Sequence, residues 1–285
     1  MNRHDFRFFE RLRVRWAEVD MQQIVFNGHY LLYADTAVAG YWRALALPYQ
    51  EAMQMLGGDI FVRKATLEYL APAVYDDLLE IGVRCGRIGN SSMAFEIGVF
   101  RADELLVSGE LLYVFADPVA RQAQTVPPEL RNLMLGFDAG EAMVDVRVGT
   151  WDVLGREAQM IRSEVFVAEQ KIPAEMEWDA ADAECIHAVA YNRLGMPVAT
   201  GRLLEHVPGV AKIGRMAVRR ALRGSRVGRA VLEALMQAAR DRGEREVILH
   251  AQMSAEPFYR RAGFSQRGPV FEEAGIAHAE MVRAL

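Results

Sequence analysis

The stretch "RRALRGSRVGRAVLEAL" (residues 219–235) combines the residue types that hold an anion. Arginines and two glycines, Gly224 and Gly228, lead directly into a run typical of an amphipathic helix. Free N–H groups at a helix N-terminus, together with the positive end of the helix dipole, favour a phosphate or another anion. The stretch lacks the Gly-Lys-Ser/Thr of a P-loop. The alternative is that the two glycines only shape a solvated surface loop.

A second candidate for chemistry is Asp20, in "WAEVDMQQIVFNGHYLLYADTA". It follows a predicted strand and precedes a strongly apolar helix. A carboxylate there can act as a general base or as a nucleophile. The first amides of the helix, near Asn27 and Gly28, are placed to bind a developing oxyanion. The alternative is an ordinary loop or capping aspartate.

Five strands and one long helix are expected to position Asp20. The first strand is predicted over residues 11–19, and residues 28–47 predict a helix that is apolar on most faces, which indicates that a sheet wraps it. Four further runs have mostly alternating polarity: "DIFVRKATLEYL", "LLEIGVRCGRI", "SMAFEIGVF" and "ELLVSGELLYVFAD". We therefore expect an antiparallel sheet curled around one helix.

The second half alternates strands and helices around the glycine turn. We expect a strand at "MVDVRV", a helix over about 156–166, a polar loop, three strands, the turn with its helix, and a short helix at "EPFYRRAG" between late strands. The helix after the turn carries an expected apolar stripe of Val227, Val231, Ala234, Leu235 and Ala238. The pattern predicts an α+β fold. A shift in composition between residues 116 and 146 divides the chain into domains 1–137 and 138–285.

The amino-acid composition limits the classes of partner that are expected. The formal net charge of −5 argues against nucleic acid as the main partner. Two distant cysteines, Cys85 and Cys185, give neither a disulfide framework nor a metal site, so no metal is expected. The N-terminal residues do not read as a signal peptide. No apolar run approaches the roughly 20 residues of a membrane helix, so no membrane partner and a cytoplasmic location are expected.

The second half, from about residue 143 to 285, resembles the GNAT superfamily of N-acetyltransferases. The family's pyrophosphate loop, Arg/Gln-x-x-Gly-x-Gly/Ala, corresponds to Arg223, Gly224, Ser225, Arg226, Val227 and Gly228, continued by Arg229. Arg226 stands where the middle glycine usually is. "MAV" (Met216 to Val218) matches the strand that pairs with the pantetheine arm. The resemblance implies that the anion is the pyrophosphate of coenzyme A.

"AEPFYRRAGF" matches the late motif of the same family, which implies that Tyr259 protonates the leaving thiolate. The alternative is a core aromatic beside Phe258. The resemblance implies acetyl transfer from acetyl-CoA to an unidentified amine. Four side chains are candidates for the base, and none is singled out: Glu169, Glu177, His187 and His278. The acidic run "EMEWDAADAE" is interpreted as a solvated loop rather than as an attractor for a cationic acceptor.

Residues from about 8 to 118 resemble the hotdog fold, specifically the 4-hydroxybenzoyl-CoA-thioesterase-like acyl-CoA thioesterases. Their signature, Asp-x-x-Gly-x-Val followed by a helix tyrosine, corresponds to Asp20, Gln23, Val25 and Tyr30, with Gln23 in place of the glycine. The resemblance implies thioester hydrolysis with Asp20, Asn27 and Gly28 at the catalytic site. Hotdog sites form between subunits, so it also implies a homodimer or homotetramer.

The two resemblances imply that both halves bind the same kind of ligand, a thioester of coenzyme A. The leading hypothesis is a bifunctional enzyme that uses acyl-CoA and acetyl-CoA as substrates, with no tightly bound cofactor. The alternative is a thioesterase whose GNAT domain only binds acyl-CoA as a regulatory sensor.

Overall fold

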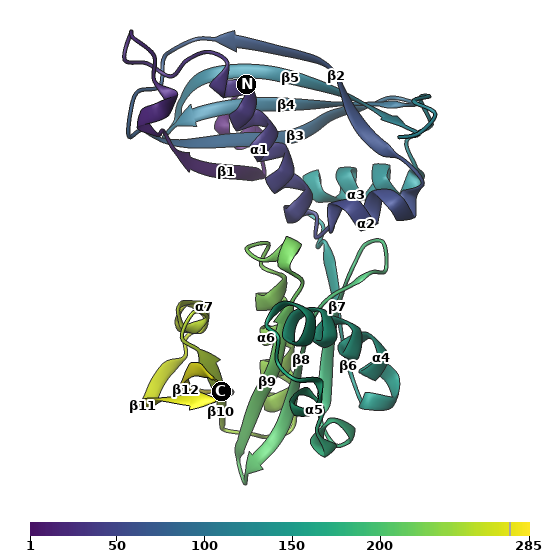
Figure 1. Ribbon diagram of the computed structural model, residues 1–285, viewed down its shortest axis with the longest axis vertical. Coiled ribbons are helices and arrows are strands. Elements are labelled where there is room, and N and C mark those ends of the chain that lie inside the picture. Colours follow the sequence, from purple (N-terminus) through teal and green to yellow (C-terminus); the bar gives the residue numbers. More distant parts are fainter. Residues whose placement is uncertain (274) are drawn as a thin grey trace. The chain divides into compact units, whose positions relative to one another are not determined.

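The computed structural model describes residues 1–273 and 275–285 and divides the chain into two compact units, Met1–Met143 and Val144–Leu285 (Figure 1). We call them the N-terminal and C-terminal units. The division falls later than the boundary expected after residue 137. The expected boundary lies one residue before the end of α3 (Pro128–Asp138), which belongs to the N-terminal unit and whose Phe137 packs edge-on against Tyr41 with ring centroids 5.3 Å apart.

The N-terminal unit is built on one antiparallel sheet with strand order β1-β3-β4-β5-β2. Its strands are β1 (Phe8–Arg13), β2 (Asp59–Tyr69), β3 (Leu78–Ile88), β4 (Ser92–Arg101) and β5 (Glu104–Ala116). The long α1 (His29–Ala44) lies along the sheet, and α2 (Tyr49–Leu56) follows it (Figure 1). The antiparallel sheet with one long helix confirms the expected architecture.

Helix α1 is covered on one side only. Tyr33, Ala37 and Tyr41 are buried in the core of the unit. On the opposite side, Leu31 is 41% exposed and Leu32 is 60% exposed. The expectation of a helix wrapped on most faces is therefore wrong for a single chain, because one sheet covers only one face.

The predicted strand over residues 11–19 is also wrong after Arg13. β1 ends at Arg13, and Trp16–Glu18 form a 3-10 turn. The carboxylate of Glu18 accepts hydrogen bonds from the Arg15 backbone N–H (2.7 Å) and from the Tyr33 hydroxyl (2.8 Å). These bonds close the turn and tie the loop that contains Asp20 to α1.

The C-terminal unit contains a seven-stranded sheet with order β11-β12-β10-β9-β8-β7-β6, in which only β9 and β10 run parallel to each other. Its strands are β6 (Val144–Gly149), β7 (Ile186–Asn192), β8 (Pro197–Val207), β9 (Val210–Val218), β10 (Glu246–Gln252), β11 (Ser265–Glu273) and β12 (Ile276–Ala284). Every residue of β7 after Ile186 is buried. Because successive side chains point to opposite faces, both faces of this strand are covered.

Two helices provide the main cover. α4 (Trp151–Arg162) buries Leu154, Ala158 and Ile161 in a cluster that includes Val189 on β7. It begins earlier than the predicted helix and continues into a π-helical stretch, Ser163–Glu169. α6 (Val227–Asp241) packs on β8. Three residues of the predicted stripe, Val227, Val231 and Leu235, are buried as expected. The prediction is wrong for Ala234 and Ala238, since Leu232, Met236 and Ala239 complete the buried side instead.

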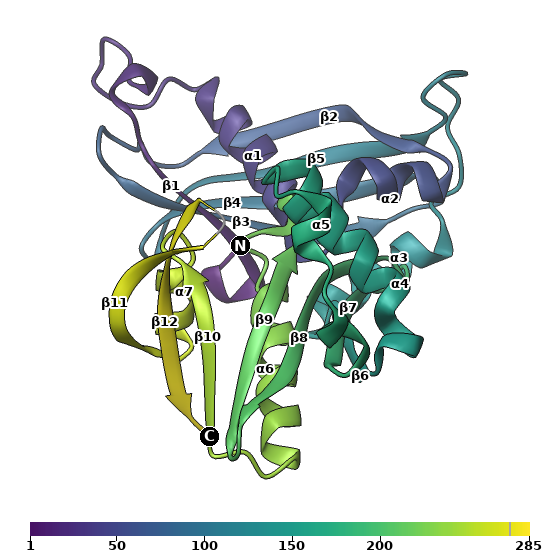
Figure 2. The ribbon, with the colours of Figure 1, turned by 60° about the horizontal axis from the view of Figure 1, so that its bottom comes forward.

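The parallel strands β9 and β10 separate partway along their length, and we call the place where they separate the fork. The strands pair only over Val210–Ile213 and Glu246–Leu249. Beyond those residues they diverge (Figure 2). The helices α5 (Ala174–Glu177) and α7 (Glu256–Arg261) lie in the segments that follow α4 and β10 in the chain. From Gly214 on, the edge of β9 that faces away from β8 has no strand partner among the described residues.

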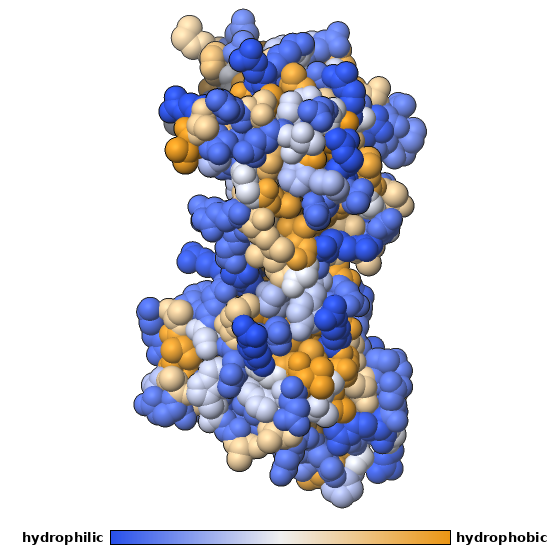
Figure 3. All heavy atoms as spheres, turned by 90° about the vertical axis from the view of Figure 1, so that its right-hand side faces the viewer, coloured by the Kyte–Doolittle hydropathy of each residue, from blue (hydrophilic) through white to orange (hydrophobic). Residues whose placement is uncertain are grey.

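The face drawn in Figure 3 is mostly hydrophilic, with apolar side chains in separate groups on each unit. No helix of the 284 described residues combines the length and apolarity that a bilayer crossing requires.

Candidate functional site

The N-terminal unit contains a cavity of about 430 Å³ beside the start of α1. Asp20, Asn27 and Tyr30 all line it, so the structure brings three of the sequence-predicted positions together. The other wall is the segment that follows β2, beginning with Tyr69 at its end. The lining is otherwise mainly apolar.

Asp20 sits in a tight turn. Its Oδ1 accepts the N–H of Gln22 at 2.8 Å, and its backbone N–H donates to Ile24 O at 2.9 Å. Gln23, which replaces the family's glycine, has a φ of 63°. A left-handed φ is the conformation that a glycine would adopt without strain. The turn therefore keeps the geometry of the glycine although the residue has changed.

The start of α1 presents bare amides to solvent. Gly28 is the N-cap of α1, and within residues 1–273 and 275–285 neither its N–H nor that of Asn27 donates a hydrogen bond. Both residues are exposed. The Tyr69 hydroxyl donates to Asn27 O at 3.2 Å, and the Ala73 N–H donates to the Tyr30 hydroxyl at 3.0 Å. These two bonds hold the cavity's opposite wall against the helix start. Gly28 itself does not line the cavity.

The glycine turn of the C-terminal unit is a second group of bare amides. Gly224 and Arg226 have φ of 88° and 69°. The N–H groups of four turn residues point to no acceptor among the residues that the structure describes: Gly224, Arg226, Val227 and Gly228. The Ser225 hydroxyl donates to Leu222 O at 2.6 Å and closes the turn. Four backbone N–H groups without an acceptor at a helix start can bind an anion.

The arginines around this turn differ in how they are paired. Arg223 donates to both carboxylate oxygens of Glu169, at 2.6 and 2.8 Å, and Arg229 pairs with Glu233 one helical turn later. The predicted base candidate Glu169 therefore lies at the turn and is bound to an arginine there. No ion pair of Arg226 occurs in the part of the chain that the structure covers. Its guanidinium is available to a phosphate.

A cavity of about 430 Å³ lies at the fork between β9 and β10. Met216 on β9 and Tyr259 on α7 both line it, whereas Val218 does not. The Tyr259 ring packs against Phe258 at 4.9 Å, so the core-aromatic interpretation also describes its surroundings. Burial raises the pKa of Tyr259, so the hydroxyl stays protonated.

The four candidates for the base do not all lie at the same site. Glu177 and His278 line the cavity. His187 does not: it is buried, its Nε2 lies 2.8 Å from Asp182 O, and burial lowers its pKa. Among the polar side chains of this cavity that the sequence interpretation missed are Lys212, His250 and Glu273. They come from β9, β10 and β11, and only the pairing of these strands brings them together.

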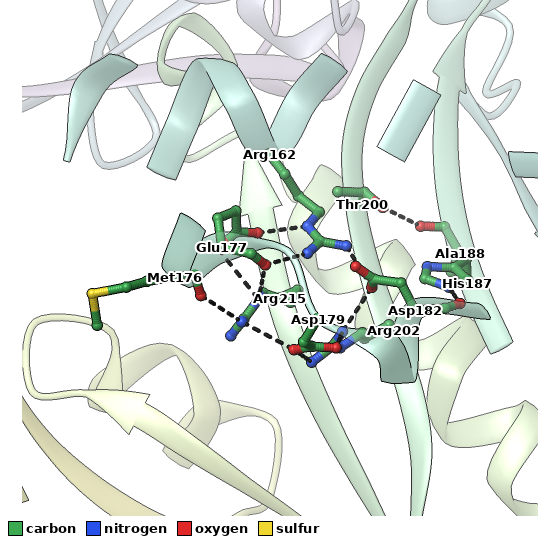
Figure 4. A network of polar contacts seen from close by, with 10 residues as sticks. All are labelled: Arg162, Met176, Glu177, Asp179, Asp182, His187, Ala188, Thr200, Arg202 and Arg215. Carbon is green, nitrogen blue, oxygen red and sulfur yellow. Dashed lines mark hydrogen bonds and ion pairs between the residues drawn. The ribbon is translucent and has the colours of Figure 1, made fainter. Parts of the chain in front are cut away.

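A network of arginines and carboxylates adjoins the cavity (Figure 4). Its members Glu177, Asp179, Arg202 and Arg215 line the cavity, whereas Arg162 and Asp182 do not. Arg162 donates to Glu177 Oε1 at 2.6 Å and to Asp182 Oδ1 at 2.7 Å, and Arg202 also reaches Asp182 at 2.6 Å. Arg202 makes two further bonds to Asp179, each of 2.7 Å. The acidic run was predicted to be a solvated loop. This is wrong for Glu177 and Asp182, which are buried because distant arginines compensate their charge.

Comparisons with known proteins agree with the two sites. Residues 22–108 match the model of the thioesterase superfamily, and residues 154–285 match that of the acetyltransferase (GNAT) domain. The chain is 38% identical over 129 residues to the uncharacterized N-acetyltransferase YjcF of Bacillus subtilis, covering 45% of this chain and 91% of that protein. It is 28% identical over 120 residues to the acyl-CoA thioester hydrolase YbgC of Escherichia coli, covering 42% of this chain and 89% of that protein. The chain therefore belongs to the thioesterase superfamily through its N-terminal unit and to the GNAT acetyltransferases through its C-terminal unit.

Proposed function

We propose that the protein is a bifunctional CoA-thioester enzyme. Its N-terminal unit hydrolyses acyl-CoA, and its C-terminal unit transfers acetyl from acetyl-CoA to an amine. The observation that carries the proposal is the same in both units: each presents amides without acceptors among the described residues at a helix start, at Asn27 and Gly28 and again at Gly224, Arg226, Val227 and Gly228. Each unit also contains a cavity of about 430 Å³.

In the N-terminal unit, the thioester carbonyl lies against the amides of Asn27 and Gly28. The carboxylate of Asp20 then activates water or attacks the carbonyl itself, and the amides stabilise the oxyanion that forms. Asp20 is held for this role by its bond from the Gln22 N–H. The products are a carboxylic acid and free CoA.

The N-terminal site is completed by a second copy of the chain. Strand β2 is an edge of its sheet, and Val62 on it is 55% exposed. The exposed Leu31 and Leu32 on α1 add apolar area that a single chain leaves in water. An unpaired apolar edge strand favours pairing with another copy. Sedimentation of the full chain tests this, since a monomer at micromolar concentration contradicts it.

In the C-terminal unit, the pyrophosphate of CoA binds the amides of Gly224 to Gly228, with Arg226 as a further contact. The pantetheine arm adds to the unpaired edge of β9 near Met216 and Val218, in the manner of an extra strand. The acetyl group then reaches the cavity at the fork. The amine attacks it, and the Tyr259 hydroxyl gives its proton to the leaving thiolate.

Substitution of Asp20 tests the hydrolase half. We expect Asp20→Asn to lower kcat/KM for acyl-CoA hydrolysis by about 10³-fold, because general base catalysis contributes about 10²–10⁴. The assay is release of free thiol from a panel of acyl-CoAs. Asp103→Asn is the matched control, since that carboxylate is 98% exposed and lines no cavity. Equal turnover by wild type and Asp20→Asn would remove the proposed role.

The transferase half is tested by calorimetry with acetyl-CoA, followed by a screen of amine acceptors. Binding that weakens in Gly224→Val, which forces a branched side chain into a φ of 88°, supports the pyrophosphate site. Binding without transfer to any amine would favour a sensor role for this unit.

A further inference from the structure

Lys212 is a cationic side chain of the C-terminal cavity that forms no ion pair with any residue that the structure describes. Lys212 projects from β9 and lines the cavity together with Gly214, Met216 and Tyr259. Among the residues described, no carboxylate forms an ion pair with its ammonium group. The cavity's arginines differ, because Arg202 and Arg215 both pair with Asp179.

The nearest group to the ammonium is an imidazole. Lys212 Nζ lies 3.3 Å from His250 Nδ1 and 3.4 Å from His250 Nε2. Glu273 Oε2 lies 3.1 Å from Nδ1 of the same ring. When Nδ1 donates to Glu273, Nε2 keeps its lone pair in the plane of the ring. Because Nζ is almost equidistant from the two nitrogens, the imidazole has to turn before Nε2 accepts a proton from Lys212. A proton acceptor is therefore within reach of this amine.

The surroundings also favour the neutral amine. Burial lowers the pKa of Lys212, although the charges of Glu273 and Glu280 act in the opposite direction. Glu280 lies 4.0 Å from His250 Nε2, and His278 is the other titratable group that lines this part of the cavity. A neutral amine is the nucleophile that thioester aminolysis requires.

The lysines of the chain differ sharply in position. Only three of its 33 lysine and arginine residues are lysines: Lys64, Lys171 and Lys212. Lys64 lies in the N-terminal unit and Lys171 in the C-terminal unit; both are exposed, and neither lines a cavity. The one lysine in the cavity at the β9–β10 fork is thus also the one that faces the proposed position of the acetyl group.

We propose that Lys212 is a self-acetylation site, at which the C-terminal unit transfers the acetyl group of bound acetyl-CoA to its own Lys212 Nζ. This inference rests on the proposed binding of acetyl-CoA by that unit. The ammonium first gives one proton to His250 Nε2, which passes it to solvent. Nζ then attacks the thioester carbonyl, forming the N–C bond, and the C–S bond breaks. The second proton of the nitrogen goes to the CoA thiolate, so the products are acetyl-lysine, CoA thiol and one proton.

The test uses the full chain, acetyl-CoA as the only acetyl source, and mass spectrometry of tryptic peptides over time. Acetylation blocks cleavage after Lys212 and leaves "LLEHVPGVAKIGR" intact. We expect Lys212 to be modified more than about 100-fold faster than Lys64 or Lys171, because a bound thioester is held next to it. Excess CoA should suppress the reaction at Lys212 only.

Two variants keep the test decisive. Lys212→Arg preserves the positive charge and should abolish the modification while acetyl-CoA still binds. His250→Gln should slow it about 100-fold, the lower end of what a positioned base contributes. Bound acetyl-CoA without preferential acetylation of Lys212, or equal rates at all three lysines, would overturn the inference. Absence of acetyl-CoA binding in calorimetry would instead overturn the proposed function of the unit.

Discussion

Replacing Arg162 by methionine is expected to destabilise the C-terminal unit strongly. The guanidinium is 1% exposed and is bonded to Glu177 and Asp182, whose side chains are 3% and 6% exposed. It also donates to Glu177 O at 2.8 Å and lies 4.6 Å from the centre of the Trp178 ring. Arg162→Met removes these contacts and leaves three acidic side chains to be balanced by Arg202 and Arg215 alone.

The structure sets the size of the effect. Breaking a buried ion pair by removing one partner costs about 3–5 kcal/mol, because a buried charge is left uncompensated. Asp182 keeps its bond from Arg202, and Glu177 keeps Arg215 at 3.3 Å. We therefore expect the lower end, about 3 kcal/mol. Adding Glu177→Gln to Arg162→Met should recover part of this loss, because it restores the charge balance.

The pH dependence has a definite sign. Burial raises the pKa of Glu177 even with Arg162 present, and the loss of Arg162 raises it further. The ionised form is the one that destabilises the variant. Lowering the pH through this raised pKa protonates Glu177, so the difference between Arg162→Met and wild type should shrink as the pH falls.

Hydrogen exchange in increasing urea measures the effect in one unit at a time. The readout is the opening free energy of peptides from β7 and β8, with β4 of the N-terminal unit as the internal control. A change below about 0.5 kcal/mol, which is typical of surface substitutions, would refute the reasoning. It would mean that the network does not hold the segment from Ala174 to Ala183 in place.

Two further perturbations follow from the local geometry. Gln23→Gly and Arg226→Gly each remove a side chain from a residue whose backbone is left-handed, with φ of 63° and 69°. Each should stabilise its own unit by about 0.5–1 kcal/mol in the same exchange experiment, because the relief of about 1–2 kcal/mol of backbone strain outweighs the extra entropy of the unfolded chain. A loss of stability would contradict this. Burial alone would raise the pKa of Glu18, but its bonds from Arg15 and Tyr33 lower it below the usual value. Its contribution to stability is therefore complete above the ordinary carboxyl pKa and is lost as the pH falls through the lowered one. Glu18→Gln should flatten that acid loss in the N-terminal unit, and an unchanged pH profile would count against it.

The sequence predicted regular elements where the polarity pattern was unambiguous. β2 to β5 coincide with the four predicted alternating runs, and the glycine turn leads into α6 as expected. The strand predicted over residues 11–19 failed after Arg13 because a side chain–backbone bond decides the local conformation there. Glu18 satisfies the Arg15 N–H and draws the chain into a 3-10 turn. The alternation of polar and apolar residues along the sequence gives no information about such a hydrogen bond.

The residues of the candidate sites also differ in whether the sequence could predict them. Asp20, Asn27 and the turn from Arg223 to Gly228 are local in sequence, so the resemblance to known families could single them out. The partners at the β9–β10 fork could not be identified in this way, because Lys212, His250 and Glu273 are contributed by three strands. The acidic run was misread for a related reason. Whether Glu177 and Asp182 face water depends on Arg162 and Arg202, which lie on other elements.

The central claim is that each unit holds one CoA thioester, and the binding stoichiometry tests it most directly. Equilibrium dialysis of the full chain against a thioether analogue of acetyl-CoA, which neither unit can cleave, should give two equivalents per chain. Gly224→Val, which disturbs only the turn at α6, should reduce this to one. One equivalent or none in the wild type, or a count that Gly224→Val leaves at two, would contradict the account.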